Sequence, residues 1–197
     1  DLAPDPRRLA IDGLTETYRP GGRTLVLGCG TGAVADRLAD LTGSCGGVIA
    51  VDADTESIRF ARRRYQRPSL GFERGGFERL DDEIAGAFDA VFVDAAWLTD
   101  EHHATRLVKS LDRQGDAYLY CVDEAARDCT ISALRTISNK HPITRRTPWH
   151  AGDAALLHAK LRDARDVSDL QNPPPDSPES DHDPRGDGDA EHDDEWR

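Results

Sequence analysis

The chain has 197 residues, of which 37 are acidic and 25 basic, so its formal net charge is −12. Such a length is typical of one ordinary domain, because single hydrophobic cores usually span about 100–200 residues. Hydrophobic residues make up 38% of the chain, and no apolar run reaches the roughly 18 residues that a membrane-spanning helix needs, which excludes such a helix. No signal peptide is visible. We therefore expect a cytoplasmic protein without a membrane partner.

The acidic excess lies at the carboxyl end. Residues 163–197 contain ten Asp, three Glu and three Arg, and so carry −10 of the net −12, whereas residues 1–162 are nearly neutral. The chain has 22 Arg against three Lys and 27 Asp against 10 Glu, a composition that resembles the proteomes of salt-loving archaea. The alternative is an ordinary domain with an acidic tail, in a GC-rich genome that favours Arg over Lys.

The four cysteines, Cys29, Cys45, Cys121 and Cys129, have spacings that match neither a CxxC pair nor a zinc pattern. We expect four reduced thiols in a cytoplasmic protein, with no disulfide and no metal site.

Short apolar runs alternate with amphipathic stretches along the chain. In chain order, the first half predicts a helix over 5–18, a strand over 24–27, a helix over 33–41, a strand over 48–51 and a helix from 54 or 55 up to Pro68. The second half predicts a weak strand over 70–73, a polar helical or looped segment over 77–87, a strand over 90–93, a helix over 100–111, a strand over 117–122 and a helix over 124–138. Runs 143–147 and 154–161, joined by a loop at 149–152, predict a closing hairpin.

This alternation predicts an α/β fold of three layers, in which helices cover both faces of a doubly wound, mostly parallel, Rossmann-like sheet of seven strands with an antiparallel final strand. Ligands bind such sheets at the carboxyl ends of the strands. We expect an amino-terminal helix or cap over 1–20, the main domain over 21–162 and a disordered acidic tail over 163–197, because so charged a segment cannot bury enough apolar surface. His182 and His192 in this tail are weak candidates for loose metal binding, and a solubilising tail is the simpler alternative.

The most informative stretch is Gly28-Cys29-Gly30-Thr31-Gly32, which joins a predicted strand to a predicted helix. Glycines there allow a sharp turn and the close approach of a ligand to the backbone. Asp52 ends the next strand, 20 residues after Gly32, where a carboxylate can accept hydrogen bonds from both hydroxyls of a ribose. Together they predict a pocket for a nucleoside-containing cofactor. The alternative is a tight strand–helix connection, with Asp52 only capping a helix.

Over residues 21–162 these features resemble the class I S-adenosylmethionine-dependent methyltransferases. The Gly-x-Gly-x-Gly spacing and the closing hairpin are similar to that family rather than to dinucleotide-binding dehydrogenases. The resemblance implies S-adenosylmethionine as the cofactor and a fourth strand, Phe88-Asp89-Ala90-Val91-Phe92-Val93-Asp94, that ends beside the transferred methyl. The implied cofactor contacts are Gly28, Cys29, Gly30 and Gly32 for the methionine part, Asp52 and Ala53 for the ribose, Phe77 over the adenine, and Asp94.

Two positions depart from the pattern of that family. Val26 stands two residues before the first glycine of the loop, where members usually carry an acid that helps to hold the amino group of the cofactor. Gly76 stands where they often have an Asp that meets the adenine, and the neighbouring Glu73 or Glu78 is a substitute. These departures favour an alternative function, that of a catalytically silent relative that binds a nucleoside ligand or a protein partner.

The stretch Asp94-Ala95-Ala96-Trp97 resembles, with both prolines replaced by alanine, the Asp-Pro-Pro-aromatic motif of amino-methylating members. The resemblance implies that Asp94 accepts a hydrogen bond from a target amine while Trp97 stacks on its ring. A second resemblance, to oxygen-methylating members, implies instead that Asp94 is a metal ligand or a base near a hydroxyl. The alternative without chemistry has Asp94 capping the next helix and Trp97 in the core. His102 and His103 are further base candidates, because imidazole titrates near neutrality.

Two other groups carry weaker signals. His150, in the predicted hairpin loop, is a weaker base candidate than the two histidines above. A basic cluster on the helix after Asp52 is of the kind that can track a phosphate backbone, although Asp54 and Glu56 one turn earlier favour ion pairs within the protein. The cluster consists of Arg59, Arg62, Arg63, Arg64 and Arg67. A nucleic-acid partner is therefore not favoured.

The sequence thus predicts a methyltransferase that moves a methyl group from S-adenosylmethionine to a nitrogen or oxygen of an unidentified small-molecule or macromolecular acceptor. Asp94 and Trp97 are its candidate catalytic residues, and we expect no metal. An aminopropyl-transferring enzyme on the same scaffold is a minor alternative, because it would need more acidic residues near the acceptor than this sequence has there.

Overall fold

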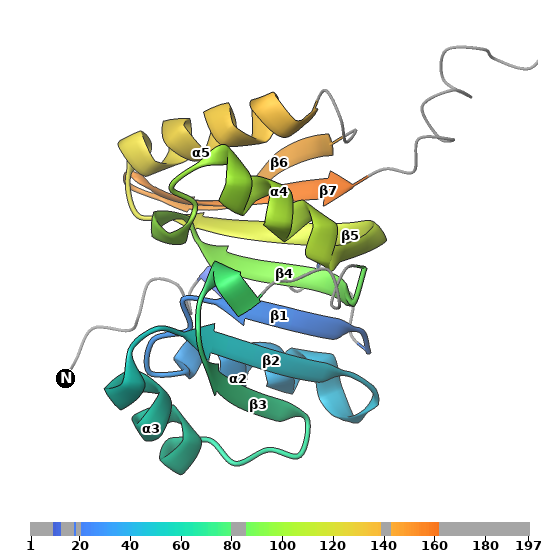
Figure 1. Cartoon of the computed structure of the whole chain (residues 1–197), viewed down its shortest axis with the longest axis vertical. Coiled ribbons are helices and arrows are strands. Elements are labelled where there is room, and N and C mark those ends of the chain that lie inside the picture. Colours follow the sequence, from blue (N-terminus) through green and yellow to red (C-terminus); the bar gives the residue numbers. More distant parts are fainter. Residues whose placement is uncertain (1–9, 13–17, 19–20, 80–85, 139–142, 162–197) are drawn as a thin grey trace, which may run out of the picture.

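The computed structural model describes residues 10–12, 18, 21–79, 86–138 and 143–161. Within these ranges one sheet has seven strands in the order β3-β2-β1-β4-β5-β7-β6 (Figure 1). The strands are β1 (Arg23–Leu27), β2 (Gly47–Asp52), β3 (Leu70–Arg74), β4 (Phe88–Asp94), β5 (Leu111–Cys121), β6 (Ile143–Ala151) and β7 (Ala154–Leu161). Strands β1 to β5 run parallel, and β7 is antiparallel to both of its neighbours. The predicted fold class, with its antiparallel final strand, is confirmed.

Helices cover both faces of the sheet. On one face lie α2 (Ala33–Thr42) and α3 (Thr55–Arg64), and on the other lie α4 (Glu101–Ser110) and α5 (Glu124–Ser138). Figure 1 shows α4 and α5 in front of the sheet and α2 behind it. Two hydrophobic clusters fill the spaces between these three layers.

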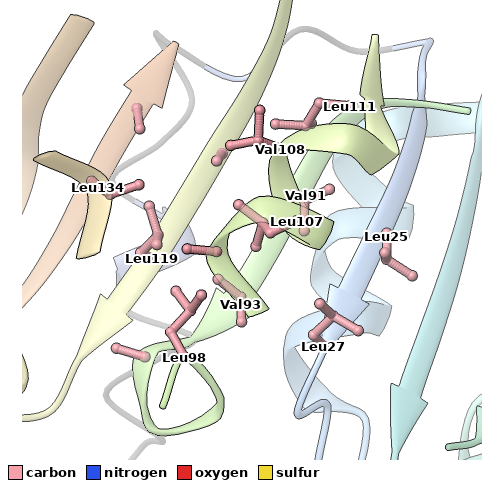
Figure 2. Close-up of a cluster of buried hydrophobic side chains, with 14 of the residues drawn as sticks. Leu25, Leu27, Val91, Val93, Leu98, Leu107, Val108, Leu111, Leu119 and Leu134 are labelled. Atoms are coloured by element: carbon pink, nitrogen blue, oxygen red, sulfur yellow. The ribbon is translucent and has the colours of Figure 1, made fainter. Parts of the chain in front are cut away.

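The alternation of side chains along β1 explains the two clusters. Leu25 and Leu27 join the cluster under α4 and α5, whereas Val26 joins the one under α2 and α3. Figure 2 shows Leu107 of α4 beside Val91 and Val93 of β4, with Leu25 and Leu27 on the neighbouring strand β1. A strand buried on both faces needs a continuous apolar run, which is the pattern that identified it in the sequence.

Aspartates cap the amino ends of three of the described helices: Asp54 for α3, Asp100 for α4 and, through the Ala126 N–H, Asp123 for α5. Asp54 accepts hydrogen bonds from the backbone N–H groups of Glu56 and Ser57 and from the Ser57 hydroxyl, and starts α3. Asp100 accepts from the backbone N–H of His103 and starts α4. The bonds from Ser57 and from His103 hold the pKa of Asp54 and of Asp100, respectively, below the usual value, since they favour the ionised carboxylate.

Some predicted boundaries differ from the structure. β5 begins at Leu111, six residues before the predicted start, because Leu111 pairs with Phe88 of β4, with a register irregularity before Asp116 pairs with Ala90. The predicted hairpin loop at 149–152 is wrong: residues 149–151 pair with β7, and the turn is formed by Gly152 and Asp153. Of the predicted first helix, only residues 10–12 are described, and they are helical. The rest of that helix, most of segment 80–87 and the tail with its two histidines lie outside the described residues.

No helix within the described ranges is both long enough and apolar enough to cross a membrane.

The four thiols differ in accessibility, which predicts a labelling pattern. Cys45 and Cys129 are exposed, whereas Cys29 and Cys121 are buried, and desolvation raises the pKa of the Cys121 thiol. At pH 8 in the folded protein, a thiol reagent should modify Cys45 and Cys129 quickly and the other two only after denaturant is added. Mass spectrometry of the labelled protein checks this. Rapid labelling of a Cys45→Ser/Cys129→Ser variant without denaturant would contradict the packing described here.

Candidate functional site

The order in which the chain adds strands to the sheet reverses beside β1, and the carboxyl end of β1 marks this place. Leu27 pairs with Val51 of β2 on one side and with Val93 of β4 on the other. One residue further along the three strands stand Gly28, Asp52 and Asp94. The chain runs from β1 outward through β2 and β3 and then returns to β4 on the opposite side, so this edge is a topological switch point, the usual ligand site of such sheets. The structure therefore brings the predicted loop and both predicted carboxylates together.

Backbone hydrogen bonds hold the glycine loop in place. Gly28, Gly30 and Gly32 all have positive φ angles, of 72°, 52° and 90°, which other residues rarely adopt. The N–H groups of Gly28 and Cys29 both donate to the carbonyl of Val51, at 3.0 and 3.1 Å, and that of Gly32 donates to the Cys29 carbonyl. The loop is thus attached to the end of β2 before any ligand arrives.

Asp52 is the side chain that completes this attachment. Its Oδ2 accepts from the Gly30 N–H at 2.7 Å, and its Oδ1 accepts from the Asp54 N–H at 2.9 Å. The cap of α3 is Asp54, so Asp52 does not have the helix-capping role that was its alternative. Each carboxylate oxygen has two lone pairs, so the half-buried Asp52 keeps acceptor capacity toward solvent, with exposed Ala53 beside it.

Two glycines of the loop contact protein side chains closely. A Cβ on Gly32 would lie 2.9 Å from Ala61 Cβ and 2.9 Å from Phe72 Cε1, so Gly32 lets α2 pack against α3 and β3. A Cβ on Gly28 would lie 2.6 Å from the Trp97 Nε1 atom. The sequence predicted a sharp turn, an opening for a ligand and, as the alternative, a tight strand–helix connection, but not these contacts with Ala61, Phe72 and Trp97. The signal was present, because the last glycine of such loops commonly permits close helix–strand packing.

At the end of β4, Asp94 begins a short 3-10 turn, Ala95–Trp97. Asp94 Oδ1 accepts from the Ala96 N–H at 3.1 Å, so one carboxylate oxygen has the capping role that was an alternative to chemistry. Trp97 is half-buried against the cluster below α4. Within the described residues, no three His, Cys, Asp or Glu side chains form a set that could hold a metal ion.

Phe77 is packed within the protein. Its side chain is 5% exposed, and its ring stacks on the His103 ring with centroids 4.5 Å apart and planes 15° apart. Arg106 donates to the Phe77 carbonyl at 2.8 Å, and His103 Nδ1 lies 3.0 Å from the Thr99 hydroxyl. Phe77 is expected to lie over the adenine of the cofactor. Part of its surface contacts α4 in the structure. His102, by contrast, is exposed. No sequence pattern links Phe77 to His103, so this contact was not predicted.

The structure shows what surrounds Val26 and Gly76, the two positions that depart from the family pattern. Val26 is 1% exposed and belongs to the core below α2. The Gly76 N–H donates to Glu78 Oε1 at 2.7 Å, so Glu78 curls back onto the loop after β3, whereas Glu73 is exposed. Of the two acids considered as substitutes, Glu78 is the one that lies against Gly76.

Most of the basic cluster, which lies on α3 and, for Arg67, just after it, has partners within the protein. Arg59 pairs with Glu56 at 2.9 Å, and Arg62 donates twice to the Phe72 carbonyl. Arg67 pairs with Asp36 and Asp40 of α2. These bonds support the interpretation that the cluster forms ion pairs and hydrogen bonds within the protein rather than a surface for a phosphate backbone. His150 lies within β6, opposite Ala155, rather than in a loop.

Comparisons with known proteins agree with this geometry. Residues 25–115 match a family model described as a methyltransferase domain. The fold is similar to that of a SAM-dependent methyltransferase from Aquifex aeolicus, with 14% identity, a TM-score of 0.62, and 80% of this chain and 93% of that chain covered. A SAM-dependent O-methyltransferase from Thermotoga maritima aligns with 17% identity and a TM-score of 0.63, over 82% of this chain and 66% of the other.

Aeropyrum pernix fibrillarin, in complex with natively bound S-adenosyl-L-methionine, is also similar, with 17% identity, a TM-score of 0.60, and 77% of this chain and 74% of that chain covered. A search of curated proteins finds no match. At these identities the structural likeness establishes a Rossmann-like methyltransferase fold.

Proposed function

Because residues 25–115 of the chain belong to the methyltransferase-domain family, we propose that the protein binds S-adenosylmethionine and transfers its methyl group to a nitrogen or oxygen of an acceptor. One observation carries the proposal: the glycine loop, Asp52 and Asp94 meet at the switch point of the sheet. There the loop takes the methionine part of the cofactor, and Asp52 takes the ribose hydroxyls. The cofactor supplies a methyl group activated by a positively charged sulfur.

The chemistry asks little of the protein beyond positioning. The lone pair of the acceptor atom forms the new bond to the methyl carbon while the carbon–sulfur bond breaks, and the sulfur keeps that electron pair. The acceptor proton then passes to Asp94 or to water. Asp94 supports the reaction by aligning the acceptor with its carboxylate, at the end of the strand next to β1. Half-buried Trp97 helps to exclude water from the reacting atoms.

Calorimetric titration of the full chain with S-adenosylmethionine and with S-adenosylhomocysteine tests the proposal. We expect both to bind, in low salt and in molar salt, because hydrogen bonds and apolar contacts rather than long-range charge hold the ligand. Absence of binding at millimolar ligand in both conditions would refute a methyltransferase function. Formation of S-adenosylhomocysteine is then followed with a panel of planar amines, phenols and catechols, which separates nitrogen from oxygen acceptors.

A second candidate function is that of a catalytically silent relative that binds the nucleoside ligand without turnover. The buried Val26 favours it, because no carboxylate at that position can hold the amino group of the cofactor. Binding of S-adenosylmethionine without turnover, across acceptors of both classes, is the result that would select this alternative.

A further inference from the structure

One edge of the Trp97 indole lies against the first glycine of the loop. The three atoms nearest to a Cβ built on Gly28 are Trp97 Nε1 at 2.6 Å, Cδ1 at 2.9 Å and Cε2 at 3.1 Å. All three belong to the five-membered ring, on the side that carries the N–H. The only hydrogen-bonding atom of the Trp97 side chain is therefore the part that approaches the loop.

This N–H has no acceptor among the described residues. No hydrogen bond from Trp97 Nε1 is formed to any of them. In the same part of the chain, no fully buried side-chain nitrogen or oxygen lacks a partner, so Nε1 retains access to solvent. Toward the described part of the chain the donor is thus unpaired, half-sheltered and open to a ligand on the loop.

The loop itself has few donors to spare. The N–H groups of Gly28 and Cys29 donate to Val51, that of Gly30 to Asp52 and that of Gly32 to Cys29. A negatively charged ligand group at this place needs a donor from another element. The amino end of α2 has no side-chain cap and is the positive end of the helix dipole, and Asp36, the acid in its first turn, is paired with Arg67.

We infer that the Trp97 Nε1–H donates a hydrogen bond to the carboxylate of the amino-acid half of the cofactor, and so makes the site prefer ligands that carry this carboxylate. The inference rests on the proposed function, which places that half of the cofactor on the glycine loop. It assigns Trp97 a role in cofactor selection through the edge of its ring, separate from any contact of its face with an acceptor.

The test compares two ligands on two proteins. S-adenosylmethionine and decarboxylated S-adenosylmethionine differ in the carboxylate alone, and Trp97→Phe keeps an aromatic ring while removing the N–H. Calorimetry should show that Trp97→Phe binds S-adenosylmethionine about ten- to a hundredfold more weakly, the usual effect of losing a hydrogen bond to a charged group. The same variant should bind the decarboxylated ligand as the wild-type protein does, within about twofold.

Trp149→Phe is the matched control, since it makes the same chemical change on β6, at the far edge of the sheet. It should leave the affinity for both ligands unchanged. An equal loss of affinity for both ligands in Trp97→Phe would mean that the indole acts by packing. No loss of affinity would mean that Nε1 makes no bond to the ligand. Either result overturns the inference and leaves the proposed function standing. If the wild-type protein binds neither ligand, the inference and the proposed function both fail.

Discussion

Replacing Asp52 with alanine should weaken S-adenosylmethionine binding by more than about a hundredfold. The carboxylate is the acceptor proposed for two ribose hydroxyls, and each hydrogen bond to a charged group contributes about 1.5–3 kcal/mol. The same change removes the 2.7 Å bond that holds the Gly30 N–H and therefore releases the middle of the loop. Calorimetric titration of the variant measures the effect, and a thermal melt establishes that the variant is folded.

Asp54→Ala is the control for this experiment. Asp54 lies two residues away and caps α3, but its carboxylate accepts only from Glu56 and Ser57 of that helix. Its loss should lower the melting temperature at neutral pH and leave cofactor affinity nearly unchanged. The pKa of Asp54 is depressed in the folded state, so its stabilising effect is present above the pKa of the unfolded chain and disappears as the pH falls through the lower folded value.

Asp94→Ala should weaken cofactor binding less than Asp52→Ala does. Asp94 stands at the end of β4, on the proposed acceptor side, and one of its oxygens already caps the following turn. The reverse order of the two variants would mean that the ribose and acceptor positions are wrongly assigned.

Gly32→Ala should be strongly destabilising. Gly32 has a φ angle of 90°, and its new Cβ would meet Ala61 Cβ and the Phe72 ring at 2.9 Å. The left-handed backbone costs about 1–2 kcal/mol for a residue with a Cβ. Overpacking adds about 1–3 kcal/mol, because these neighbours belong to a helix and a strand that cannot move apart freely. Urea denaturation measures the free energy of unfolding.

Gly43→Ala separates the two contributions. Gly43 also has a positive φ angle, 72°, but a Cβ there would have nothing within 4 Å. Its ψ angle of −158° places it in a region that essentially only glycine adopts, so this variant should lose only the backbone part, about 1–3 kcal/mol. If the two variants are equally destabilised, the close packing of α2 on α3 and β3 does not constrain Gly32.

The fold could be predicted because its causes are local. The parallel strands β1, β2 and β4 are short apolar runs, and each helix that follows has apolar residues about one turn apart. The start of β5 could not be found in this way, since residues 112–114 are exposed and polar. The strand reaches back to Leu111 because Leu111 pairs with Phe88 of β4, with a register irregularity before Asp116 pairs with Ala90. The hairpin turn was misplaced for a similar reason: residues 149–151 belong to β6 because β7 pairs with them.

The candidate site, too, could be predicted only where its causes are local. The glycine loop and the acids that end β2 and β4 were visible in the sequence, since a parallel sheet places the ends of neighbouring strands side by side. The sequence by itself thus determined the sheet, its switch point and the residues that stand there.

Only the tertiary structure decided which of these residues touch. The edge of Trp97 lies on Gly28, 69 positions away, and the Phe77 ring stacks on His103, 26 positions away. Local propensity and periodicity carry no information about such pairs, because these contacts arise when separate strands and helices pack against one another. For that reason the role of Trp97 as a donor toward the loop became apparent only in the folded arrangement.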